Sequence, residues 1–176
     1  MYVGVEIGLG NWTYSLLVED RALGALLAGW VVSGYWFGFT AGRFVLSPLA
    51  ERFGVGPVAL VRGCLAVVVG AGLVVWLVPG AVAAAAGLVV LGVALGPLYP
   101  LTVAVLPSMA PGRLVPTGIG LLVGVSVIGG ALFPWLAGTL AESAGLGTLL
   151  PFVLCLTAVL MVTWWRVSAR MRVTAT

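Results

Sequence analysis

Six apolar runs follow one another along the chain, each separated from the next by a short polar or Gly/Pro-rich connection. A helix rises about 1.5 Å per residue, so runs of this length come close to the roughly 30 Å hydrocarbon core of a bilayer. The pattern predicts an all-α integral membrane protein, a single six-helix transmembrane domain with a short polar tail at residues 168–176. The predicted spans cover residues 1–18, 23–46, 58–78, 83–106, 117–140 and 149–167.

The composition agrees with a lipid environment and argues against several classes of function. Hydrophobic residues make up 62% of the chain and charged residues 7%, whereas soluble domains carry about 25% charged residues. The mean hydropathy is +1.23. Because His and Lys are absent, we expect neither a base-assisted nucleophile nor a metal site, and no enzyme activity. Cys64 and Cys155 lie inside apolar runs and are expected to be buried.

The arginines predict the orientation of the chain. All eight cations are Arg, which together with abundant Ala, Gly and Val suggests a GC-rich bacterial genome. With the N-terminus in the cytoplasm, six arginines fall on the inner side: Arg52, Arg62, Arg113, Arg166, Arg170 and Arg172. Arg43 joins them if it snorkels from the second span, and Arg21 is left outside with Glu19, Asp20 and Glu142. We therefore predict a multi-pass protein of the cell (plasma) membrane with both termini and the tail cytoplasmic. The net charge of +3 then reflects this orientation, and no nucleic-acid partner is expected.

Glycines spaced by four residues predict where helices approach closely. The second span carries Gly34, Gly38 and Gly42, and the fifth carries Gly120 and Gly124. Six spans with both termini inside can also be divided into two three-helix units of opposite insertion. Inverted repeats of this kind build many secondary transporters.

The stretch SPLAERFG at residues 47–54 resembles the loop signature of the major facilitator superfamily, G-x-L-A-D-R-x-G-R-R. Four positions match directly: Leu49, Ala50, Arg52 and Gly54. Glu51 replaces the usual Asp, Ser47 replaces the first Gly, and the trailing basic pair is missing. Such degeneration is typical of the copy in the C-terminal half. Residues 2–12 with 35–43 resemble the seventh and eighth helices of fucose/glucose-permease-like members, and residues 118–145 resemble the eleventh.

The resemblance implies half of a twelve-helix fold that moves a small-molecule substrate across the lipid bilayer by alternating access. The partner is then an N-terminal six-helix half or a second copy of this chain, with the substrate between the halves and a sugar as the first guess. The loop at residues 47–54 is implied to latch the cytoplasmic side, although a plain topogenic hairpin is an alternative. No cofactor is expected, and a coupling proton or sodium ion stays open. A truncated or remnant half without autonomous transport, acting at most as a structural partner, is the other interpretation, and the short first run favours a truncated reading frame.

Glu6 is an ionisable residue inside an apolar run, where a charge costs about 2.5–3.5 kcal/mol near the helix centre. One hypothesis is that it lines the central cavity and binds substrate or carries a coupling proton. The alternative is that Glu6, close to the start, lies at the cytoplasmic interface. At about 100° per residue, Asn11 faces away from Glu6, so only a break near Gly8 and Gly10 could bring both into one cavity.

The fourth run contains GPLYPLT, in which Pro97 and Pro100 predict a kink and freed backbone carbonyls. Tyr99 and Thr102 lie on one face of this segment. In the superfamily the first helix of each unit lines the cavity, which here implies the first and fourth spans. The candidate substrate or coupling residues are therefore Glu6, Asn11, Trp12, Tyr99 and Thr102.

Overall fold

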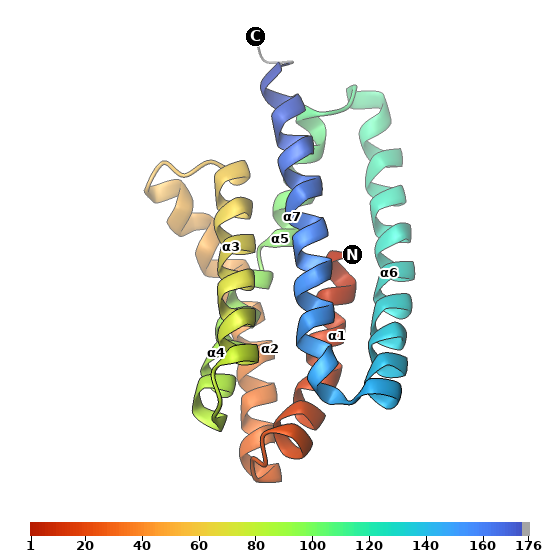
Figure 1. Cartoon of the computed structure of the whole chain (residues 1–176). Helices are drawn as coiled ribbons and strands as arrows, with labels where there is room; N and C mark the ends of the chain where they lie inside the picture. Colours follow the sequence, from red (N-terminus) through yellow and green to blue (C-terminus); the bar gives the residue numbers. More distant parts are fainter. Residues whose placement is uncertain (174–176) are drawn as a thin grey trace.

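The computed structural model of the chain describes residues 1–173, with side chains described as far as Ala169. This part consists of helices that run alongside one another, and it contains no strand (Figure 1). The elements are α1 (Tyr2–Ser15), the π-helical η1 (Leu16–Asp20), α2 (Ala25–Arg52), α3 (Pro57–Leu77), α4 (Ala81–Leu95), α5 (Leu98–Val105), the 3₁₀ turns η2 (Leu106–Ser108) and η3 (Gly112–Leu114), α6 (Val115–Ala144), η4 (Leu146–Thr148) and α7 (Leu149–Val173).

Four helical segments of the described chain are long and apolar enough to cross a membrane: Pro57–Leu77, Ala81–Ser108, Gly112–Ala144 and Leu146–Ala169. The first two predicted spans are not among them. The α-helical part of the first, α1, has 14 residues, and in α2 glycines and polar side chains are interspersed with the apolar ones. The structure therefore supports an all-helical membrane protein, while six spans in two inverted units remain a proposal.

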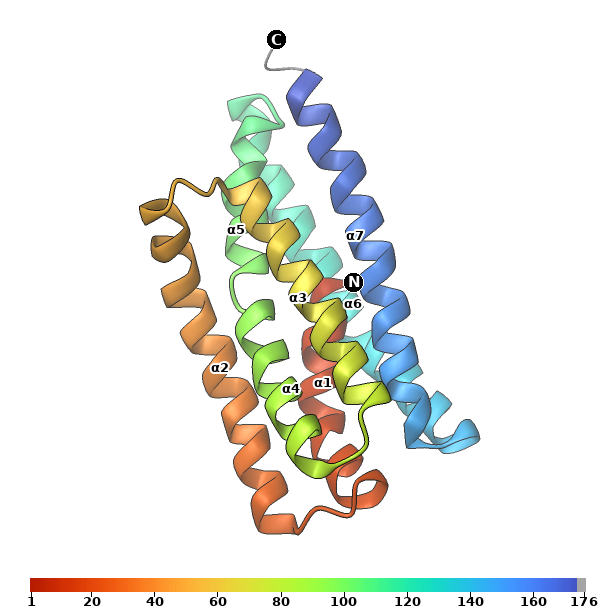
Figure 2. The same cartoon turned by 60° about the vertical axis from the view of Figure 1, so that its left-hand side comes forward.

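Two groups of contacts hold the bundle together. α4 packs along both α2 and α3, and α3 packs along α7, as Figure 2 shows. α1 packs mainly on α6 and also touches α2 and α7. The main core is built largely from Leu and Val side chains of α1, α3, α4, α5 and α7, to which α2 adds Ala28, Tyr35 and Phe39. The second half of α6 contributes a smaller cluster in which Ala137 and Ala141 meet Leu149. Cys64 is buried as expected, but Cys155 is exposed on α7.

The contact between α2 and α4 depends on glycines of both helices. A Cβ atom on Gly42 would overlap the carbonyl oxygen of Val93, and one on Gly92 would overlap that of Tyr35. Gly38 faces the backbone of Val89 and Val93, and Gly34 faces the Val89 side chain. Since the obstructing atoms are largely backbone, the helices could not keep this distance with larger residues.

Gly120 and Gly124 differ from the glycines of α2. Nothing lies within 4 Å of a Cβ built on either residue, and both are exposed. The first half of α6 has no long helix against it in the described chain, because α1 reaches only the second half. The close helix contact expected of these two glycines is therefore not made within the described part of the chain.

The stretch at residues 47–54 is mostly helical rather than a loop. α2 continues through Pro48 to Arg52, and only residues 53–56 connect it to α3. Leu, Ala, Glu and Arg favour the helix, which explains why it continues past the apolar run. Gly54, with φ of 68°, ends the helix in a Schellman motif. Its N–H donates to the Glu51 carbonyl (3.0 Å), and the Val55 N–H donates to that of Ala50 (2.8 Å).

Replacing Gly54 with alanine should lower the free energy of unfolding by about 1–2 kcal/mol, because Ala is strained at positive φ. Equilibrium unfolding of the chain in detergent by added SDS measures the change. Gly147→Ala is the matched control, since Gly147 has no positive φ and no atom within 4 Å of a built Cβ. Equal effects of the two substitutions would contradict this role for Gly54.

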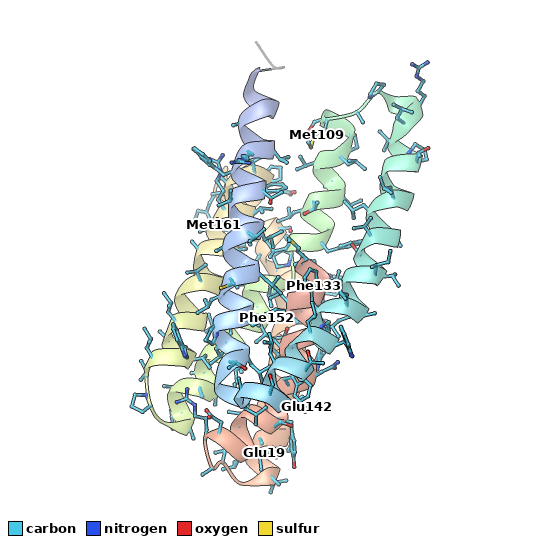
Figure 3. All side chains as sticks on the ribbon, turned by 45° about the vertical axis from the view of Figure 1, so that its right-hand side comes forward. Glu19, Met109, Phe133, Glu142, Phe152 and Met161 are labelled. Carbon is cyan, nitrogen blue, oxygen red and sulfur yellow. The ribbon has the colours of Figure 1, made fainter. Side chains whose placement is uncertain are left out.

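Acidic residues lie near one end of the bundle. Glu19 and Glu142 lie near one end and Met109 near the other (Figure 3). Arg21, the arginine predicted to lie outside, is at the acidic end. Its Nη2 donates to the Val75 carbonyl at 2.6 Å, and its Nε pairs with Asp20 at 3.1 Å. Arg21 thus caps the C-terminal end of α3, where the helix dipole favours a cation.

Candidate functional site

The fourth predicted span is interrupted in its middle. α4 ends at Leu95 and α5 begins at Leu98, as the two prolines predict. Pro97 and Pro100 have no N–H, so the carbonyls of Val93 and Gly96 lose their usual helical donors. The Val93 carbonyl lies against Gly42. Two backbone oxygens at the break, those of Leu95 and Gly96, are reached by side chains of other helices.

The side chains of Tyr2 and Arg43 donate hydrogen bonds to the carbonyls of Leu95 and Gly96. The Tyr2 hydroxyl, from α1, donates to the Leu95 carbonyl at 2.9 Å. The Nε of Arg43, from α2, donates to the Gly96 carbonyl at 3.3 Å. The Arg43 guanidinium also lies 4.8 Å from the centre of the Phe39 ring, within the range of a cation–π contact. Side chains of α1 and α2 therefore both bind the backbone of the fourth predicted span at the point where its helix is interrupted.

Glu6 lies beside these donors. Its carboxylate lies close enough to Tyr2 and Arg43 for its charge to act on both. Its backbone carbonyl accepts a hydrogen bond of 2.9 Å from the buried hydroxyl of Tyr35. Tyr2 stacks on Tyr99 of α5, with ring centroids 6.3 Å apart and planes 25° apart. We call this set the break cluster; its members are Tyr2, Glu6, Tyr35, Arg43, Tyr99 and the carbonyls of Leu95 and Gly96.

The break cluster lies near half the length of the bundle. α1 begins beside the middle of α6, where a Cβ on Gly129 would lie 3.2 Å from the Met1 nitrogen, and Figure 1 shows the N-terminus at mid-height. Glu6 is little more than one turn further on. The geometry therefore places Glu6 within the bundle and not at the end that was predicted to be cytoplasmic.

The other candidate residues are distributed unevenly. Thr102 is one turn along α5 from the cluster, and its hydroxyl donates to the Leu98 carbonyl at 2.7 Å. Trp12 points to α6, where its Nε1 donates to the Pro134 carbonyl at 3.3 Å and its ring covers Gly138. Asn11 is exposed. Since α1 is unbroken from Tyr2 to Ser15, the break near Gly8 and Gly10 is absent, and Glu6 and Asn11 stay on different faces of the helix.

Three residues of the cluster were missed by the sequence reasoning. Arg43 was counted only as a snorkelling cation, although the cost of a charge in an apolar run, applied to Glu6, singles it out equally. Tyr2 lies four residues before Glu6 and so shares its helix face, but the hydroxyl partners of Tyr2 and Tyr35 depend on tertiary contacts that the sequence does not show. No group of three or more His, Cys, Asp or Glu side chains that could hold a metal occurs among the described residues.

Comparison with known proteins identifies the family. A family model of the Major Facilitator Superfamily matches residues 4–174. The chain belongs to this superfamily. Its members are generally transporters, and the long apolar helices of this chain agree with a multi-pass membrane protein.

One curated relative is Bypass of stop codon protein 6 of Saccharomyces cerevisiae, to which the chain is 29% identical over 155 residues. The match covers 83% of this chain but 31% of the yeast protein, so the chain spans about a third of its relative's length. No solved structure matches the chain.

Proposed function

We propose that the chain is the C-terminal six-helix half of a secondary transporter that moves a small polar solute by alternating access. In this proposal α1 with η1 and α2 are the two further spans, and the two inverted units are α1–α3 and α4–α7. The break cluster carries the proposal. It combines an acid, a cation and an interrupted helix near mid-depth, and broken helices at such positions line substrate sites in transporters.

The separation of charge along the bundle supports an orientation. Glu19 and Glu142 lie near one end (Figure 3). The C-terminal end of α2, which is Arg52, and the connection from α5 to α6, which contains Arg113, lie toward the other end (Figure 1). Under the positive-inside rule the arginine-rich end is cytoplasmic. We propose the plasma membrane as the location, with both termini inside.

The missing partner is proposed to cover the faces that this chain leaves open. Gly120 and Gly124 offer a close-approach surface on α6, and Asn11 and Arg43 are exposed. An N-terminal six-helix half, or a second copy, would complete a cavity around the break cluster. Glu51 and Arg52, exposed at the end of α2, are proposed to form the cytoplasmic latch with that partner. The fucose/glucose-permease-like subtype and a sugar substrate rest on the sequence resemblance alone.

A second candidate function is a half without autonomous transport that serves as a structural partner. The observation that favours it is the exposure of polar residues of α1 and α2, which leaves the site with one wall. Transport by the chain alone then fails, and a second half does not restore it.

Proteoliposome uptake distinguishes these functions. The chain is reconstituted alone and together with the six-helix N-terminal half of a superfamily member, and uptake of radiolabelled glucose, lactate and succinate is measured. We expect uptake at least tenfold above that of empty liposomes with both halves present. Uptake that stays at the level of empty liposomes in every combination would contradict a transporter half, and uptake only with the partner would exclude autonomous transport.

A further inference from the structure

We propose that the transported solute carries a carboxylate, and that the free edge of the Arg43 guanidinium binds it. This inference rests on the proposed function and specifies its substrate class. It begins with a row of polar side chains along α2: Ser33, Thr40, Arg43 and Ser47. At about 100° per residue these four lie within an arc of about 80°.

The polar row on α2 is not covered by the rest of the described chain. Ser33, Thr40 and Arg43 are exposed and Ser47 is half-buried. The hydroxyls of Ser33 and Thr40 donate hydrogen bonds within their own helix, to the carbonyls of Gly29 and Trp36, each at 3.0 Å. Their oxygens remain able to accept. Polar and ionisable residues of membrane helices face a water-filled path or protein rather than lipid, so this face of α2 lines the solute path.

Arg43 is held in one orientation by two contacts. Its Nε donates to the Gly96 carbonyl, and its plane lies against Phe39. Among the described residues neither Nη1 nor Nη2 makes a hydrogen bond, and the one ion pair joins Arg21 to Asp20. Glu6 acts on Arg43 by its charge but lies beyond ion-pair distance. The cation therefore presents its outer N–H groups without a paired anion.

A carboxylate complements that edge better than a neutral solute does. The Nη1 and Nη2 groups form a planar fork whose two parallel N–H bonds match the two oxygens of a carboxylate. A sugar hydroxyl could accept one of these bonds, but it would leave the positive charge uncompensated in an apolar span. Because the fork is already oriented by Gly96 and Phe39, little further ordering is needed when the anion binds.

Binding is tested by thermal unfolding of the purified chain in nanodiscs, followed by tryptophan fluorescence. The probes are sodium succinate and sodium lactate, with glucose and equal sodium chloride as references. We expect the two carboxylates to raise Tm in a saturable manner, and Arg43→Gln to abolish the shift. Arg113→Gln is the matched control, because Arg113 is exposed in the connection before α6, and it should leave the shift unchanged.

Arg43→Lys keeps the charge but loses the planar fork. It is expected to raise the half-saturating succinate concentration at least tenfold, and this variant decides the question if Arg43→Gln does not fold. An unchanged response in either variant, or a wild-type chain that responds to glucose and to neither carboxylate, would overturn the inference. Glucose uptake that survives Arg43→Gln would reject the carboxylate while preserving the proposed transporter. Carboxylate binding without any uptake would support the anion site at Arg43 and contradict the proposed transporter.

Discussion

Replacing Gly92 with alanine is expected to separate α2 from α4 and to lower the free energy of unfolding by about 3 kcal/mol, the upper range for overpacking a close contact. The added Cβ would overlap the Tyr35 carbonyl oxygen, and a backbone atom in a helix cannot move aside as a flexible side chain can. The midpoint of SDS-induced unfolding in detergent measures the loss.

The matched control is Gly63→Ala in α3, where a built Cβ has no atom within 4 Å. It should change the midpoint little. Gly42→Ala, which meets the Val93 carbonyl from the opposite helix, should resemble Gly92→Ala. If Gly92→Ala unfolds at the same midpoint as Gly63→Ala, then the two helices do not depend on this contact.

The glycine pairs illustrate what the sequence can predict about packing. Both α2 and α6 carry the same small-residue spacing, yet in the described chain Gly34, Gly38 and Gly42 of α2 meet another helix and Gly120 and Gly124 of α6 do not. The difference lies in the partner: Gly92 in α4 and Gly96 at its end lie against α2, while nothing in the described chain faces Gly120 and Gly124. Glycines spaced by four residues predict a surface on one helix that another helix could approach closely. An actual contact also requires a second helix whose surface fits it.

The ends of the helices were harder to predict than their existence. Long apolar runs specify helices in lipid because each backbone group must be bonded within the segment. The apolar run of α2 stops near Leu46, but helix-favouring residues carry the helix on to Arg52, and Gly54 ends it by its positive φ. The apolar run predicts which part of the helix lies in lipid, whereas the capping residues determine where the helix ends.

The candidate site was predicted in part because prolines and intramembrane charges have strong local consequences. Pro97 and Pro100 predicted the break, and Glu6 was singled out by its cost in lipid. The partners of the break could not be predicted, because the Arg43–Gly96 contact joins residues 53 positions apart. It exists only when glycines let α2 and α4 approach each other, so the packing of these two helices and the chemistry of the break cluster depend on the same contact.

The second large effect is expected at Glu6. Glu6→Gln keeps the shape of the side chain and the backbone carbonyl that accepts the Tyr35 hydroxyl, but it removes a group that can ionise beside Tyr2 and Arg43. If Glu6 carries a coupling proton or binds the solute, uptake by the chain with its N-terminal half should fall at least tenfold, while the SDS unfolding midpoint changes little. A structural role alone predicts the opposite, a lower midpoint with uptake reduced only in proportion to folded protein.

Two controls separate these readings of Glu6. Glu142→Gln removes an exposed carboxylate near the acidic end of the bundle and should leave uptake unchanged. Tyr35→Phe removes the hydrogen bond to the Glu6 backbone and leaves the carboxylate in place, so it should lower stability more than transport. Uptake by Glu6→Gln at the wild-type rate, with and without an imposed proton gradient, would exclude Glu6 from substrate binding and from proton coupling. The break in the fourth span would then be a site where Tyr2 and Arg43 bind backbone carbonyls, without a role for the acid beside them.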